Sequence, residues 1–211
     1  MESNKNIFKE NSKINFNKKA EVYDKSYDGK FVAPMYDEII NRIISANPKK
    51  ILDVGCGTGN VLKKLVSNEN LSLYGLDISE KMIEIAKKNL ENRAELKVGD
   101  SEYMPWGDDS FDVIVCNASF HHYPNPKKVL LEMKRVLKSN GTLIIGDPTA
   151  PVIYRQIINL YCKISNCGDY RMYFKKEIEE LLIECGFEPF NFKKINCKSF
   201  AINARINNKE Q

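Results

Sequence analysis

The chain is short of the residues that bind metal ions in spaced pairs. It has only two histidines, and these are adjacent, at His121 and His122. The six cysteines are Cys56, Cys116, Cys162, Cys167, Cys185 and Cys197. None of them forms a C-x-x-C pair, whereas structural zinc sites are built from spaced pairs of Cys and His. We therefore expect no metal site, and free, mostly buried thiols are the simplest interpretation of the cysteines.

Strong charge and long apolar runs are missing as well. The formal net charge is only +4, from 32 basic and 28 acidic residues, and the lysines are scattered. A dedicated nucleic-acid binder usually shows a denser basic stripe, so we expect no nucleic-acid partner. No apolar run approaches the roughly 18 residues that a membrane-spanning helix requires. Residues 1–19 lack the apolar centre of a signal peptide, and a cytoplasmic location is the default expectation.

What the chain does contain is a regular alternation of strand and helix patterns. Hydrophobic residues make up 43% of the 211 residues, enough for the core of a single domain over 1–211. The segments that we expect to form strands are 50–55, 71–77, 94–100, 111–117 and 142–147. Amphipathic segments lie between them, with Ser79 and Pro126 at expected helix starts. This order predicts right-handed βαβ units and a parallel sheet.

Two flanking regions carry weaker signals. The first 20 residues are rich in Lys and Asn with little periodicity, and we expect them to be frayed unless a ligand orders them. The connection 148–173 is longer than usual, and its apolar residues fit a helix. We expect residues 1–30 to form an N-terminal cap and 148–173 to form a lid over the same edge of the sheet. A last helix, ending at Gly186, and a closing pair of strands follow.

The turn after the first strand, residues 55–59, has the sequence GCGTG and indicates a ligand. A phosphate-binding P-loop needs Lys and Ser or Thr after its glycines, but Asn60 and Val61 follow here. A dinucleotide fingerprint needs its third glycine at position 60, and Asp53 would repel a pyrophosphate. A ligand that has a cationic end and no phosphate fits better, because Asp53 attracts an ammonium group and the bare turn allows close approach.

Acids at the ends of the next two strands extend this interpretation. Asp77 ends the second strand, where a carboxylate can accept hydrogen bonds from both hydroxyls of a ribose. Asp100 ends the third, where it can accept from the amine of an adenine. Ile78 and Met82 can flank the adenine. A cation, a ribose and an adenine together indicate S-adenosylmethionine.

Four successive segments resemble the motifs of class I S-adenosylmethionine-dependent methyltransferases. They read ILDVGCGTG, LYGLDIS, VGDSEYMPWGDDSFDVIVCNASFHHYPNP and RVLKSNGTLIIGDP, and they span 51–147 in the order and spacing of that family. The most similar subgroup is the ubiquinone/menaquinone-biosynthesis-like set, which acts on small molecules. The resemblance implies an α/β, Rossmann-like, doubly wound seven-stranded sheet of order 3-2-1-4-5-7-6. Strand 7 is then antiparallel, and helical lid elements cover the site.

The resemblance also implies roles for individual residues. Asp53 and the turn would face the methionine moiety, Asp77 the ribose, and Asp100 with Ser101 the adenine. The turn consists of Gly55, Cys56, Gly57, Thr58 and Gly59. Asn117 would offer its backbone to the sulfonium. The product of the cofactor would be S-adenosylhomocysteine.

Methyl transfer from a sulfonium is an in-line displacement, so the protein mainly aligns the reactants and excludes water. A base is needed only if the acceptor carries a proton, and the candidates are His121 and His122, just after the fourth strand. The candidates for contacts with the acceptor are Tyr23, Tyr27, Arg155, Tyr170, Arg171 and Tyr173. The attacking atom of the acceptor (C, N, O or S) and the choice between monomer and homodimer stay open.

Three other functions remain open at this point. Adenine methylation of nucleic acid typically uses an Asn- or Asp-Pro-Pro-aromatic run after strand four, but residues 117–120 read NASF. Methylation of a protein is a second alternative. The third is an adenosine-ligand-binding module without turnover. A small-molecule acceptor is the prediction that fits the resemblance best.

Overall fold

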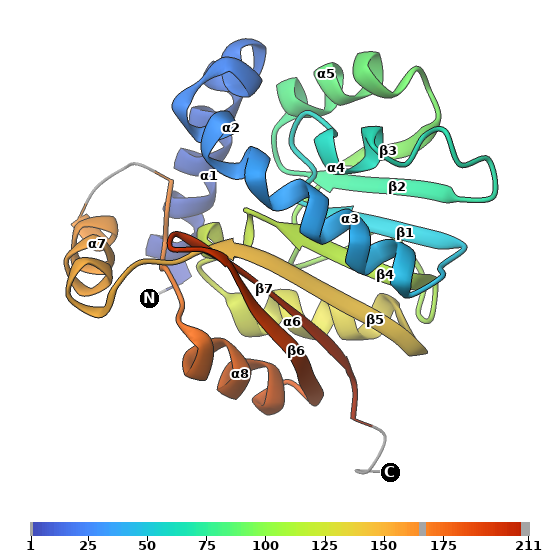
Figure 1. The fold of residues 1–211 in the computed structure, drawn as a ribbon. Coiled ribbons are helices and arrows are strands. Elements are labelled where there is room, and N and C mark those ends of the chain that lie inside the picture. The colour runs from blue at the N-terminus through green and yellow to red at the C-terminus, as the bar shows by residue number, and fades with distance from the viewer. Residues whose placement is uncertain (1, 165–167, 208–211) are drawn as a thin grey trace.

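A computed structural model describes residues 2–164 and 168–207, and Cys167 lies outside them. One sheet runs through the middle of the chain (Figure 1). Its strands are β1 (Lys50–Val54), β2 (Ser72–Asp77), β3 (Ala94–Val98), β4 (Phe111–Asn117), β5 (Leu137–Pro148), β6 (Phe187–Asn196) and β7 (Ser199–Ile206). The order is β3-β2-β1-β4-β5-β7-β6, with β7 antiparallel to both of its neighbours and the first five strands parallel. The predicted strand order is confirmed.

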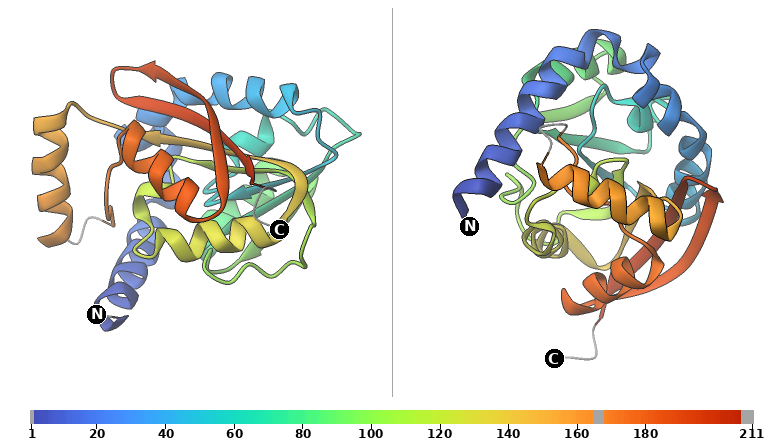
Figure 2. Two further views of the ribbon diagram at one scale, coloured as in Figure 1. Left: turned by 90° about the horizontal axis from the view of Figure 1, so that it is seen from below. Right: turned by 90° about the vertical axis from the view of Figure 1, so that its left-hand side faces the viewer.

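Helices cover both faces of the sheet, which explains the continuous apolar runs in its central strands. On one face lie α3 (Tyr36–Ser45), α4 (Asn60–Lys63) and α5 (Glu80–Leu90). On the other lie α6 (Pro126–Val136) and α8 (Lys175–Glu184) (Figure 2). Side chains alternate between the two layers, so Ile51 packs on the first face and Leu52 on the second. A hydrophobic core on each side of the sheet therefore fixes the carboxyl ends of the strands, where the predicted ligand-binding residues lie.

Some element boundaries differ from the sequence prediction. Strand β5 begins at Leu137 instead of 142, because Leu137 already pairs with Phe111 before an irregularity brings Thr142 opposite Val113. The predicted start of α5 is confirmed, since the Ser79 hydroxyl accepts a hydrogen bond from the N–H of Met82.

The expectation that the first 20 residues are frayed was wrong. They form α1 (Glu2–Lys19), which continues through η1 (Ala20–Lys25), α2 (Tyr27–Val32) and η2 (Ala33–Met35). Ion pairs hold α1 to the body: Lys9 with Asp100 and Glu102 at 2.7 Å each, and Lys13 with Glu80 at 2.6 Å. These contacts are polar and join residues that are far apart in the sequence, so the periodicity of apolar residues could not predict them. The N-terminal segment therefore crosses the carboxyl ends of β2 and β3.

The connection after β5 contains the expected helix, α7 (Val152–Ile164), which stands away from the sheet (Figures 1 and 2). Apolar side chains on it are largely exposed, including Ile153 at 72% and Leu160 at 65%. Within residues 2–164 and 168–207, none of the helices has the length and apolar character needed to cross a bilayer.

Candidate functional site

The glycine turn, residues 55–59, is hydrogen-bonded to the end of β2 on one side and faces open space on the other. The N–H groups of Gly55 and Cys56 donate to the Leu76 carbonyl at 2.7 and 3.0 Å, which ties the turn to the end of β2. Gly57 has φ +52°, and a Cβ placed there would meet nothing within 4 Å. Gly55 is closed by contrast, since a Cβ there would fall 1.9 Å from Ser119 Oγ. The turn thus offers bare backbone to a hollow at Gly57 and packs against protein at Gly55.

The Asp53 carboxylate is buried, and among the described residues it lacks the hydrogen-bond or charge partner that a buried carboxylate needs. Its side chain is buried, at 2% exposure, and Oδ1 has no hydrogen-bond partner within the described chain. Burial, with the nearby charge of Asp77, raises the pKa of Asp53 to about 8. A buried carboxylate without a partner is costly, and a cation would relieve that cost. The ammonium group of a methionine moiety is therefore well matched to Asp53.

The other two predicted acids, Asp77 and Asp100, already accept hydrogen bonds from groups of the protein. The Asp77 carboxylate accepts from the N–H of Gly57 and of Ser79, both at 2.9 Å. Burial raises the pKa of Asp77, and these N–H groups oppose the rise. Asp100 accepts from Lys9 Nζ at 2.7 Å and from the Glu102 N–H at 2.9 Å. Each carboxylate oxygen has two lone pairs, so both acids keep capacity for ribose hydroxyls or an adenine amine.

Three hollows meet at this edge of the sheet. The first, about 540 Å³ with the open space in front of it, is lined by the predicted residues Asp53, Gly55, Cys56, Gly57, Thr58, Asp77, Met82 and Asn117. The second, about 560 Å³ with its open space, has the predicted residues Asp77, Ile78, Asp100 and Ser101 in its lining. The third is larger, about 1450 Å³ with its open mouth. Phe16 and His122 line all three hollows, so the hollows join at that pair. Gly59 lines none of them and faces Ala86 and Leu90.

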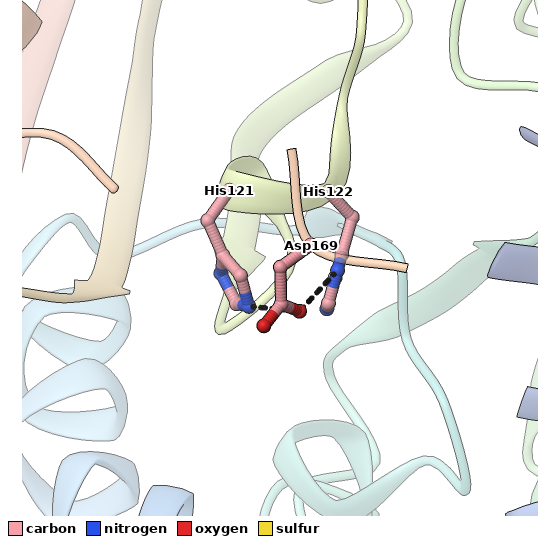
Figure 3. A group of neighbouring side chains, drawn as sticks. All are labelled: His121, His122 and Asp169. Atoms are coloured by element: carbon pink, nitrogen blue, oxygen red, sulfur yellow. Dashed lines mark ion pairs between the residues drawn. The ribbon is translucent and has the colours of Figure 1, made fainter. Parts of the chain in front are cut away.

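The two histidines and Asp169 form a cluster on the wall of the third hollow (Figure 3). His121 Nδ1 lies 2.9 Å from Asp147 Oδ1, and His122 Nδ1 lies 2.9 Å from the Gly168 carbonyl. Asp169 Oδ1 is 3.7 Å from His121 Nε2 and 3.2 Å from His122 Nδ1. Burial disfavours the charged form of His121, but the carboxylates of Asp147, Asp169 and Asp28 together outweigh burial and raise the pKa of His121. The pKa of Asp169 is lowered to about 2, because its contacts with the histidines outweigh partial burial.

The six predicted acceptor contacts do not all reach the third hollow. Tyr23 and Tyr27 line it. Arg155, a residue of α7, is buried, with its guanidinium carbon 4.4 Å from the centroid of the Phe174 ring. Tyr170, Arg171 and Tyr173 line a separate hollow beside α6 and α8. The backbone N–H groups of Tyr170 and Arg171 donate to the His121 carbonyl at 2.8 and 3.0 Å, so this segment supports the cluster from behind.

Sequence reasoning missed several residues of the site. Asp147 could have been found, because it ends β5 beside β4, and neighbouring parallel strands end at the same edge. Phe16 and Asp169 gave no such signal, since they lie in segments without a strand-end position. Thr58 and Asn60 carry a further unexpected contact, as both donate to Asp24 Oδ1 at 2.8 and 2.7 Å.

This strand order, with its antiparallel seventh strand, is that of class I S-adenosylmethionine-dependent methyltransferases, and Asp53, whose Oδ1 is unpartnered in the described chain, fits the ammonium group of that cofactor. Residues 46–198 match the family model described as a methyltransferase domain. The chain belongs to this family, and S-adenosylmethionine is its cofactor, as predicted.

Similar proteins agree with this assignment. The demethylmenaquinone methyltransferase of Thermotoga maritima is 38% identical over 129 residues, covering 59% of this chain and 56% of that protein. The enzyme of the same name from Lactobacillus johnsonii is 29% identical over 84% of this chain and 90% of its own length. The chain thus spans just over half of the first relative. An S-adenosylmethionine-dependent methyltransferase structure from Aquifex aeolicus has a TM-score of 0.69 at 21% identity, covering 90% of this chain and 98% of that one.

Replacement of Asp77 should weaken cofactor binding more than folding. In Asp77→Ala two sets of contacts are lost: those expected to the ribose, and the hydrogen bonds from the N–H groups of Gly57 and Ser79. A charge-assisted hydrogen bond contributes roughly 1.5–3 kcal/mol. We therefore expect calorimetric titration with S-adenosylhomocysteine to show at least a roughly tenfold loss of affinity. Unchanged affinity would remove Asp77 from the site, and thermal unfolding of the same samples controls for folding.

Proposed function

We propose that the protein transfers a methyl group from S-adenosylmethionine to a small, largely apolar acceptor bound in the third hollow. The observation that carries this proposal is the junction at Phe16 and His122, where the third hollow opens onto the two that fit the cofactor. Aromatic and aliphatic side chains wall the third hollow: Phe16, Tyr23, Tyr27, Phe31, Val32, Tyr154, Ile158 and Met172. Its enclosure by α2 and the segment after β5 suits a small molecule better than a duplex or a folded protein.

The chemistry fits these surroundings. In the displacement the acceptor atom bonds to the methyl carbon while the carbon–sulfur pair returns to sulfur, so the positive charge of the sulfonium disappears. An apolar, dry hollow favours that loss of charge. Asp53 would hold the ammonium, Asp77 the ribose and Asp100 the adenine, which aligns the methyl group with the junction. His121 and His122, the predicted bases, lie where an acceptor proton would have to leave.

We propose that residues 1–30 and 148–173 act as the cap and lid of this site. Lys9, Asp24 and Phe16 all come from the first of these segments and touch or line the cofactor hollows. Tyr154 and Ile158 of α7 line the third hollow from the second segment. Both segments would limit access of water during transfer.

A large side chain in the third hollow should impair methyl transfer to the acceptor without impairing cofactor binding. In Ala150→Trp a large ring enters the third hollow, and Ala150 lines neither cofactor hollow. We expect S-adenosylhomocysteine affinity to stay within about twofold, while methyl transfer from labelled cofactor to the best acceptor of a small-molecule panel falls at least about tenfold. Demethylmenaquinone belongs in that panel because of the two relatives.

The matched control is Leu131→Trp, which adds the same ring at an exposed position of α6. It should behave like the unchanged protein in both measurements. Full transfer by Ala150→Trp would place the acceptor elsewhere. Label that appears only in added protein or nucleic acid would contradict a small-molecule acceptor.

A further inference from the structure

Both histidines of the cluster are oriented by an acceptor on the same ring nitrogen. The Asp147 carboxylate lies 2.9 Å from Nδ1 of His121, and the Gly168 carbonyl lies 2.9 Å from Nδ1 of His122. An acceptor at Nδ1 calls for a proton there, which leaves the lone pair of a neutral ring on Nε2. Histidines that bind metals almost always donate their other N–H to a carboxylate or a backbone carbonyl. The cluster has one partner of each kind.

The carboxylate of Asp169 completes a set of three. One ligand atom from each of His121, His122 and Asp169 lies within 4.8 Å of the other two. The three side chains point toward one another and to the same side (Figure 3). Two ligands bonded at about 2.1 Å to a tetrahedral ion are roughly 3.4 Å apart. The distance of 3.7 Å from Asp169 Oδ1 to Nε2 of His121 is close to that separation. His122 would bind through Nε2, because its Nδ1, which lies 3.2 Å from Asp169 Oδ1, carries the proton that faces the Gly168 carbonyl.

Charge also favours a cation here. Asp147 is fully buried, and its Oδ2 has no hydrogen-bond partner in the described chain, while Asp169 stands on the other side of His121. Lys19, which lines the same hollow, pairs with Asp28 at 2.9 Å. Two carboxylates around neutral imidazoles leave a net charge of about −2, which one divalent ion balances.

We propose that His121, His122 and Asp169 bind a divalent first-row metal ion of the zinc class, with Asp147 and Gly168 orienting the two imidazoles. Two imidazoles and one carboxylate suit zinc or cobalt and are poor ligands for magnesium, which prefers oxygen alone. Three protein ligands leave a coordination position open, as in catalytic zinc sites, and it would face the third hollow. The sequence did not predict this site, because its ligands do not form spaced pairs.

The role of the ion rests on the proposed methyl transfer, although its binding does not. A hydroxyl of the acceptor, such as that of a phenol or enol, would occupy the open position. The metal lowers the pKa of a bound O–H, so the bond breaks and the proton leaves to solvent. The resulting oxyanion attacks the methyl carbon through oxygen or through the conjugated carbon of an enolate. The electron pair of the carbon–sulfur bond goes to sulfur, and a neutral thioether leaves. In the metal-bound protein the ion activates the acceptor, and neither histidine serves as the base.

Cobalt binding to the tag-free protein tests the site without any acceptor. Because the chain has only two histidines, every imidazole ligand must be His121 or His122. Cys197→Ser serves as background, since Cys197 is an exposed thiol that could bind cobalt. We expect one equivalent of Co²⁺ with visible d–d absorption, competition by Zn²⁺ but not by Mg²⁺, and two slowly exchanging imidazole N–H signals in the paramagnetic proton spectrum. Asp169→Ala and His121→Ala should weaken binding at least about 100-fold, and Asp147→Asn about 10- to 100-fold.

Asp109→Asn is the control, because it removes an exposed carboxylate just before β4, at the opposite end of that strand from His121, and asparagine tolerates the φ of 52° there. Its cobalt affinity should be unchanged. Binding of S-adenosylhomocysteine by each variant shows that it is folded. Folded protein that takes up no stoichiometric cobalt overturns the proposal, as do equal affinities in Asp169→Ala and Asp109→Asn. A thiolate-to-cobalt absorption band would assign the ion to cysteine and overturn it too. Metal binding without methyl transfer to any acceptor would instead count against the proposed function.

Discussion

Asp53→Asn should abolish tight cofactor binding while making the cofactor-free protein more stable. The amide keeps the size of Asp53 but cannot carry the charge that an ammonium group requires. Loss of about 3 kcal/mol of charge-assisted hydrogen bonding corresponds to a roughly 100-fold weaker complex. Calorimetric titration with S-adenosylhomocysteine measures the affinity. Affinity within about threefold of the unchanged protein would show that Asp53 does not contact the cofactor.

The stability gain of Asp53→Asn follows from its raised pKa. Burial raises the pKa of Asp53 from 3.8 to about 8, so the folded protein prefers the neutral carboxyl. The stability that this group contributes is present below its unfolded pKa and is lost as the pH rises through about 8. The asparagine variant has no such loss. Its melting temperature should therefore exceed that of the unchanged protein by a growing margin between about pH 5 and 8. Identical pH profiles would contradict the raised pKa.

The same pKa makes cofactor binding release protons. At pH 7 the free protein holds Asp53 mostly protonated, whereas a bound ammonium favours the carboxylate. Titrations in two buffers of different ionisation enthalpy should show release of close to one proton per cofactor, and Asp53→Asn should show none.

Gly57→Val should block the cofactor for steric reasons. The valine side chain would enter the first hollow, since nothing lies within 4 Å of a Cβ at that position. A branched residue at φ +52° also costs about 1–3 kcal/mol of backbone strain. We expect no measurable binding of S-adenosylhomocysteine and a melting temperature lower by a few degrees.

Gly57→Asn separates the steric effect from the strain. Asparagine tolerates positive φ far better than valine, yet it fills the same space. Loss of binding in both variants, with the larger loss of stability in valine, would confirm that the hollow at Gly57 holds the cofactor. Native affinity in the asparagine variant would make the turn purely structural and contradict the assignment of the site.

Strand-end positions explain which parts of the site could be predicted. Asp53, Asp77 and Asp100 lie at or just after the carboxyl ends of the parallel strands β1, β2 and β3, so the strand pattern and parallel topology bring them to one edge. The order of the last two strands came from the resemblance to a family, because β6 and β7 have no local feature that sets it. Phe16 was missed since α1 is held by ion pairs between residues far apart in the chain. Contacts of that kind depend on the finished fold.

The stretches of chain that form the walls of the third hollow affect how acceptor preference can change within the family. The first two hollows, proposed for the cofactor, are lined mainly by β1 to β4 and the turns after them, whereas much of the wall of the third hollow, proposed for the acceptor, comes from residues 15–32 and 148–172. These two stretches lie at the N-terminus and in one connection outside the five-strand parallel core. Insertions, deletions or exchange of either stretch can therefore give new acceptor preferences without altering the machinery that holds the methyl donor. Chimeras that graft only these stretches from a relative would be the economical way to redirect the enzyme.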